Sequence, residues 1–126
     1  MSNSGDLRVV VLISGNGTNL QAIIDAQHAG KINTRIVAVI SDRPAAYGLT
    51  RATVAGIEAR TLDYKSFASK TEYEARLAET LTTLDPELVV LAGYMRILPD
   101  SIVNDFAGRM LNVHPALLPA YPGLNT

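Results

Sequence analysis

Short blocks rich in valine and isoleucine recur along the 126-residue chain, and amphipathic stretches separate them. The clearest blocks lie at residues 7–14, 34–41 and 88–92. The first is apolar at nearly every position, which is typical of a parallel strand buried on both faces of a sheet. The alternation of such strands with helices predicts an α/β fold with an open, mostly parallel sheet and helices on both of its faces.

Helix signals fill the spaces between these blocks. Thr71 and Glu74 have the spacing of a capping box, which predicts that Thr71 caps a helix, and Asp85-Pro86 predicts its end. We expect helices over residues 19–29, 47–55, 72–84 and 99–106, with weaker strands over residues 57–62 and 110–113.

The composition excludes several classes of protein. Hydrophobic residues make up 48% of the chain, the net charge is -1, and the basic residues are scattered, which gives no support to nucleic-acid binding. The chain has no cysteine, so disulfides and thiolate zinc sites are excluded. The apolar run at residues 9–13 is too short for a signal sequence or a membrane span. We therefore expect a cytoplasmic protein without a nucleic-acid or membrane partner.

A glycine-rich segment, SGNGTN at residues 14–19, joins the first strand to the first helix. Free backbone N–H groups and the helix dipole favour an anion there, so we expect a phosphate site. The alternative is a turn that only reverses the chain. No Gly-Lys-Ser/Thr ends the segment, so it is not a Walker loop, and Leu20 fills the third glycine position of the dinucleotide fingerprint. This favours a mononucleotide phosphate over NAD without excluding NAD.

A second loop, at residues 93–99, leaves the carboxyl end of the strand at residues 88–92. Open α/β sheets place their ligand crevice at this edge. An apolar loop with one cation, Arg96, is suited to wrapping a flat ring. The alternative is that Met95, Ile97 and Leu98 belong to the core and that Arg96 is a solvated charge. The sequence leaves both interpretations open.

Asn112 and His114 lie two residues apart at the carboxyl end of a short predicted strand, so their side chains can project together from the same face. An asparagine N–H can stabilise an oxyanion, and a histidine with a pKa near its unperturbed value of about 6.5 can relay protons at neutral pH. Acyl transfer needs both roles, although a lone strand histidine is more often structural. His28 and His114 lack metal-ligand spacing, so we expect no metal site.

Taken in order, these segments resemble the phosphoribosylglycinamide formyltransferases, a folate-dependent family of purine synthesis. The resemblance rests on VVLISGNGTNLQAIIDA (residues 10–26), LAGYMRILP (residues 91–99) and RMLNVHPALLPAYPGLNT (residues 109–126), and extends from about Leu7 to the last residue. It implies a Rossmann-like formyltransferase fold, incomplete at the carboxyl terminus. Residues 1–126 would then form a single N-terminal, nucleotide-binding domain, truncated relative to the family.

The resemblance also implies the reaction: transfer of a formyl group from 10-formyltetrahydrofolate to the amine of glycinamide ribonucleotide, in de novo IMP synthesis and without a metal. Both substrates are small molecules, and a homodimer is left open. The matched positions for the ribonucleotide phosphate are Gly17, Thr18 and Asn19. Those for the folate are Lys70, Met95, Arg96, Ile97, Leu98 and Asn112, and those for catalysis are Asn112 and His114.

In the family the chain continues and supplies a catalytic aspartate that no residue here matches. We therefore expect the 126 residues alone to bind the nucleotide phosphate and to transfer formyl poorly or not at all. One alternative is a catalytically incomplete module that binds nucleotide phosphate. Another is a related folate enzyme, either methionyl-tRNA formyltransferase or formyltetrahydrofolate hydrolase. The weak basic content and the GNGTN loop weigh against the tRNA enzyme.

Overall fold

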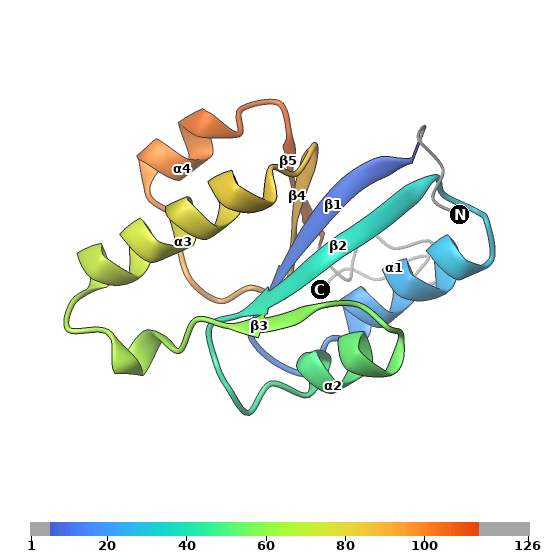
Figure 1. Ribbon diagram of the computed structural model, residues 1–126, viewed down its shortest axis with the longest axis horizontal. Helices are drawn as coiled ribbons and strands as arrows, with labels where there is room; N and C mark the ends of the chain where they lie inside the picture. Colours follow the sequence, from blue (N-terminus) through green and yellow to red (C-terminus); the bar gives the residue numbers. More distant parts are fainter. Residues whose placement is uncertain (1–5, 114–126) are drawn as a thin grey trace, which may run out of the picture.

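A five-stranded parallel sheet organises the chain in the computed structural model, which describes residues 6–113 (Figure 1). The strand order is β3-β2-β1-β4-β5, and every neighbouring pair is parallel. The order reverses beside β1, where successive crossovers leave in opposite directions, and open α/β sheets bind ligands at such switch points. The strands are β1 (Leu7–Ile13), β2 (Thr34–Ser41), β3 (Ala59–Thr61), β4 (Leu88–Ala92) and β5 (Met110–Val113).

Helices cover both faces of this sheet, as the sequence predicts. One pair, α1 (Thr18–His28) and α2 (Tyr47–Val54), lies on one face, and α3 (Lys70–Leu84) and α4 (Asp100–Asp105) lie on the other (Figure 1). A short 3-10 helix, η1 (Tyr64–Ser66), links β3 to α3. Among residues 6–113, no helix combines the length and the apolar character needed to cross a bilayer.

The central strand β1 contributes side chains to the hydrophobic cores on both faces of the sheet. Val9, Val11 and Ile13 pack in the cluster that contains α1 and α2 side chains, whereas Val10 and Leu12 pack in the cluster that contains α3 and α4 side chains. Each of these five side chains is at most 1% exposed. The unbroken apolar run in the sequence is therefore explained by burial on both faces of the strand.

Most predicted elements are confirmed, including the exact bounds of β2, β4 and β5, and β3 is shorter than expected. The predicted cap of α3 is wrong. The N-cap is Ser69, whose Oγ accepts a hydrogen bond from the backbone N–H of Glu72 at 3.1 Å, and the helix begins at Lys70. Ser69 and Glu72 have the same capping spacing as Thr71 and Glu74, so the sequence offered two starts and the earlier one forms.

Candidate functional site

The β1–α1 loop, residues 14–17, brings two backbones into direct contact. Gly17 is the N-cap of α1 and has a φ of 82°, a left-handed conformation that favours glycine. A Cβ atom at Gly17 would lie 2.7 Å from the Cα atom of Gly48, at the start of α2. A side chain at Gly17 would therefore push the loop away from α2.

Helix α2 holds this loop in place. The Gly48 N–H donates to the Gly15 carbonyl at 3.0 Å, and the Arg51 Nε donates to the Asn16 carbonyl at 2.8 Å. The same guanidinium donates through Nη2 to the Asn16 side chain at 2.6 Å. The loop is thus positioned by hydrogen bonds from a neighbouring helix as well as by its own sequence.

The end of this loop presents the backbone N–H groups of the first turn of α1. N–H groups in the first turn of a helix have no acceptor within the helix, and the dipole adds partial positive charge. Thr18 is exposed and Asn19 is 9% exposed. A cavity of about 310 Å³ opens beside the loop, between Ser14, Asn16 and Tyr47. None of residues 17–19 lines this cavity, and phosphate binding at the start of α1 stays a prediction.

The β4–α4 loop, residues 93–99, is tied to three other elements by side chains. The Met95 N–H donates to Ser14 Oγ at 2.8 Å, which joins this loop to the end of β1. The Tyr94 hydroxyl lies 2.5 Å from the hydroxyl of Tyr73 on α3. Arg96 Nε donates to Asp42 Oδ2 at 2.9 Å, directly after β2. The two loops therefore meet at the carboxyl edge of the sheet.

The alternative interpretation of the β4–α4 loop, as core residues with one solvated charge, is wrong for three of its four residues, and the ring-binding interpretation stays a prediction. Met95 and Ile97 are 72% and 88% exposed, so they are not core residues, although Leu98 packs against the α3 and α4 cluster. Arg96 is not a solvated charge, because it pairs with buried Asp42 and its guanidinium lies 3.3 Å from the centroid of the Tyr64 ring. The loop combines a fixed cation with exposed apolar side chains.

Burial changes the acid–base behaviour of the two tyrosines behind this loop. Desolvation raises the pKa of Tyr94, and the hydrogen bond between its hydroxyl and that of Tyr73 raises it further. Desolvation also raises the pKa of Tyr73, partly offset by its hydrogen bond with Tyr94. Both hydroxyls are therefore protonated at neutral pH, and the pair serves as a neutral hydrogen bond.

Asn112 lies on β5 at the same edge of the sheet. It pairs in register with Leu91 of β4, which pairs with Leu12 of β1, so the three residues form one row. Two strand spacings separate β5 from β1, which places Asn112 roughly 10 Å across the sheet from the end of β1. Asn112 is exposed. His114, its predicted catalytic partner, lies outside the described residues.

Lys70 is the first residue of α3 and is engaged with its own helix. It forms an ion pair with Glu74, four residues later, and this hydrogen bond raises the pKa of Lys70. Its side chain is 64% exposed. The neighbouring turn of α3 carries Tyr73, which contacts Tyr94 of the β4–α4 loop. The predicted folate contact of Lys70 stays a prediction.

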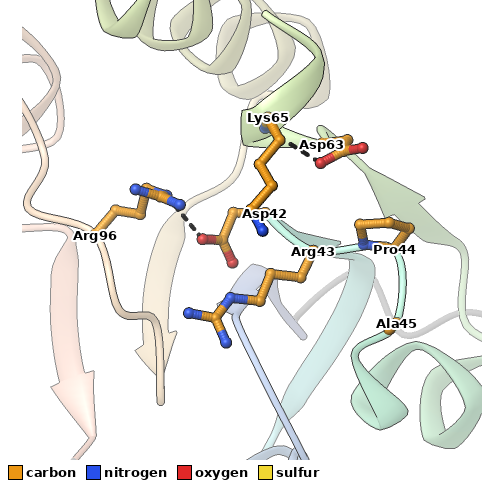
Figure 2. A pocket seen from close by; sticks show the side chains of 7 residues that line it. All are labelled: Asp42, Arg43, Pro44, Ala45, Asp63, Lys65 and Arg96. Carbon is orange, nitrogen blue, oxygen red and sulfur yellow. Dashed lines mark hydrogen bonds and ion pairs between the residues drawn. The ribbon is translucent and has the colours of Figure 1, made fainter.

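Sequence reasoning missed Asp42, although a carboxylate directly after a buried strand is a recognisable signal. Asp42 is 1% exposed, and its Oδ1 has no hydrogen-bond partner among the described residues. A cavity of about 470 Å³ opens at this carboxylate (Figure 2). Within residues 6–113, no cluster of three or more acidic or histidine side chains is placed to hold a metal ion.

Comparison with known proteins relates the whole of this architecture to one family. The family model described as formyl transferase matches residues 7–126. Phosphoribosylglycinamide formyltransferase of Escherichia coli (strain K12) is 51% identical over 120 residues, which cover 95% of this chain and 57% of that protein. The trifunctional purine biosynthetic protein adenosine-3 of Drosophila melanogaster is 48% identical over 120 residues, or 94% of this chain and 9% of that protein.

Solved structures show the same fold. Glycinamide ribonucleotide transformylase 1 from Symbiobacterium toebii superposes with a TM-score of 0.83 at 49% identity, covering 97% of this chain and 57% of that one. Phosphoribosylglycinamide formyltransferase from Coxiella burnetii gives a TM-score of 0.83 at 51% identity, covering 94% of this chain and 56% of that one. The chain therefore spans a little over half the length of these single-function relatives.

Proposed function

The chain belongs to the formyl transferase family, and from that membership we propose that residues 1–126 form the nucleotide-binding N-terminal domain of a phosphoribosylglycinamide formyltransferase. The reaction transfers the formyl group of 10-formyltetrahydrofolate to the amine of glycinamide ribonucleotide, a step of purine biosynthesis. Relatives named for this activity that are about half identical over nearly the whole chain support the proposal.

The observation that carries the proposal is the geometry of the β1–α1 loop. Gly17, Thr18 and Asn19 place backbone donors at the start of α1, and Gly48 and Arg51 hold the loop from outside. A dianionic phosphate bound there is stabilised by several N–H groups and by the helix dipole at once. The ribonucleotide phosphate is the group of this substrate that fits such a site.

The β4–α4 loop is the proposed contact for the folate. Met95 and Ile97 offer exposed apolar surface for a flat pterin ring, and Leu98 supports them from the core side. Arg96 is anchored by its hydrogen bond to Asp42, at the start of the segment that follows β2. Lys70 and Asn112 complete the proposed folate contacts.

Asn112 and His114 are the proposed catalytic pair. The amine nitrogen of glycinamide ribonucleotide attacks the formyl carbon, and the carbonyl electrons move to oxygen, where the Asn112 amide N–H stabilises the developing charge. His114 accepts the proton lost by the amine and delivers it to the departing folate nitrogen as the carbon–nitrogen bond breaks. Asn112 lies in one row with residues of β4 and β1. This position is compatible with a formyl carbon bound between the β1–α1 loop and β5.

Calorimetric titration of the chain with glycinamide ribonucleotide tests the proposal, with NAD and inorganic phosphate as comparison ligands. We expect selective binding of the ribonucleotide, weakened at least tenfold by Gly17→Val, because this change forces the loop away from Gly48. Gly30→Val is the matched control. Gly30 also has a left-handed φ, of 74°, but lies at the far end of α1 in open space.

Preferential binding of NAD, or equal effects of the two valine substitutions, contradicts the proposed phosphate site.

The catalytic role of Asn112 has a separate test in the complete enzyme. Asn112→Ala is expected to lower turnover by about 100-fold to 1,000-fold, which is the usual loss of an oxyanion donor. Unchanged turnover contradicts that role and leaves the phosphate site unaffected.

A further inference from the structure

The Asp42 carboxylate is buried, and only one of its two oxygens accepts a hydrogen bond from the described residues. Its side chain is fully shielded from solvent, Oδ2 accepts the hydrogen bond from Arg96, and Oδ1 has no partner among residues 6–113. Buried carboxylate oxygens nearly always accept hydrogen bonds, because leaving one without a donor is costly. Oδ1 is therefore an acceptor that lacks its donor.

This carboxylate lines a cavity of about 470 Å³, which is within the size range of small-molecule sites. Cationic side chains reach the cavity from three separate segments: Arg43 after β2, Lys65 on η1 and Arg96 after β4. Figure 2 shows these three side chains extending toward the region around the Asp42 carboxylate. Asp63 also lines the cavity, but it caps η1 by accepting from the Lys65 N–H.

We propose that this cavity binds a small organic anion that carries a hydroxyl or amide N–H beside its acidic group. The acidic group pairs with Arg43 and Lys65, whose charges are not matched by the single Asp42–Arg96 ion pair. The neutral donor completes the hydrogen bonding of Asp42 Oδ1. A cationic donor fits less well, because the three positive and two negative side chains that line the cavity leave it with a net positive charge.

The proposed site is centred away from the β1–α1 loop, although Arg43 and Ala45 also line the cavity beside that loop. It lies between the ends of β2 and β3 and the η1 segment, whereas the phosphate loop joins β1 to α1. It shares Arg96 with the β4–α4 loop, so a ligand bound in it touches a residue proposed to contact folate. The inference goes beyond formyl transfer and does not depend on it.

The test uses pairs of probes that differ by the hydroxyl. L-Malate and succinate form the carboxylate pair, and glycerol 3-phosphate and inorganic phosphate form the phosphate pair. Each is titrated into the chain by calorimetry, and the site is located by amide nitrogen–proton NMR shifts at Asp42, Lys65 and Arg96. We expect the hydroxylated member of at least one pair to bind about tenfold more tightly, as one hydrogen bond to a buried charge provides. The pair that shows this difference in affinity tells whether the acidic group of the ligand is a carboxylate or a phosphate.

Two variants separate the two parts of the proposal. Asp42→Asn keeps the side-chain shape but replaces the charged acceptor with a neutral amide, so the advantage of the hydroxyl should shrink well below tenfold. Lys65→Gln should weaken both members of the responding pair, and Lys31→Gln, an exposed lysine beyond α1, is its matched control. Circular dichroism establishes that each variant is folded.

Equal affinity for both members of each pair, or no binding by any probe, overturns the proposal. Binding that shifts the amides of residues 17–19 instead of those around Asp42 also overturns it. These outcomes do not depend on the result of the ribonucleotide titration, in which Gly17→Val tests the β1–α1 loop. Failure of this site is therefore distinguishable from failure of the proposed function.

Discussion

The two loops at the carboxyl edge of the sheet are held in different ways. The β1–α1 loop packs backbone against backbone, since Gly17 and Gly48 approach too closely for any side chain at Gly17, and the Arg51 side chain adds hydrogen bonds from α2. The β4–α4 loop depends on side chains, since Ser14, Tyr73 and Asp42 each bind one of its residues. The β1–α1 loop therefore packs directly against α2, whereas the β4–α4 loop is held by hydrogen bonds to side chains from three other parts of the fold.

The difference agrees with what each loop is proposed to present to a ligand. A phosphate site uses backbone N–H groups, so the backbone itself must be placed, and close packing of glycines places it. A ring-binding surface uses apolar side chains, so the backbone must be held from behind while Met95 and Ile97 stay exposed. Substitutions that act on only one loop therefore test this comparison.

Arg96→Met should have the largest effect. It leaves the Asp42 carboxylate buried without its ion-pair partner, and the expected loss is about 3 kcal/mol of unfolding free energy. Urea denaturation measures this loss. Arg60→Met is the control, because the Arg60–Glu58 pair is partly exposed and its removal should change stability little. Equal losses in the two variants would show that the buried pair does not anchor the β4–α4 loop.

Gly17→Ala should rank second, with a loss of about 2 kcal/mol from backbone crowding and left-handed strain. Its added Cβ meets the Cα of Gly48 at 2.7 Å. Gly30→Ala shares the left-handed φ but has open space around it, so the difference between the two isolates the contact with α2. If thermal unfolding shifts equally in both, the close approach of the two glycines contributes nothing.

Tyr94→Phe should cost about 1 kcal/mol, because it leaves the hydroxyl of Tyr73 without its partner behind the loop. The same pair predicts a pH dependence. Burial raises the pKa of both tyrosines above the unfolded value of 10.0. Their contribution to stability is therefore complete below about pH 10 and is lost as the pH rises above it, because the unfolded chain then releases protons that the folded chain retains.

Thermal unfolding measured between pH 8 and 11 checks this prediction. The fall in melting temperature above pH 10 should be smaller in Tyr94→Phe than in the unmodified chain, since one buried phenol has been removed. Tyr47→Phe is the matched control, because Tyr47 is 54% exposed and lies outside this hydrogen-bonded pair. An unaltered alkaline fall in Tyr94→Phe contradicts the role assigned to its burial.

Ile97→Ser should have the smallest effect, below about 0.5 kcal/mol, since the side chain is 88% exposed. Leu98→Ala, one residue further, should destabilise the chain more, because Leu98 packs against the α3 and α4 cluster. Chemical denaturation of both variants makes the comparison. A larger loss at Ile97 would mean that the loop packs differently from the arrangement described here.

Local patterns were enough to predict most of the architecture. Continuous apolar runs identify buried parallel strands, and the glycines at positions 15 and 17 mark the turn into α1. The cap of α3 was misplaced because two serine or threonine positions had the same capping spacing, and local sequence does not rank them. The catalytic pair of Asn112 and His114 stays a prediction, and His114 lies outside the described residues.

The sequence by itself determined the strand and helix periodicity and the position of the glycine-rich β1–α1 loop, because those depend on neighbours within a few residues. Only the tertiary structure decided that Asp42 meets Arg96, 54 positions later, and that Gly17 meets Gly48. Such contacts depend on strand order, which brings the ends of β2, β1 and β4 to one edge of the sheet. No local pattern encodes which distant partner arrives there, so the buried carboxylate and its cavity became visible only in the fold.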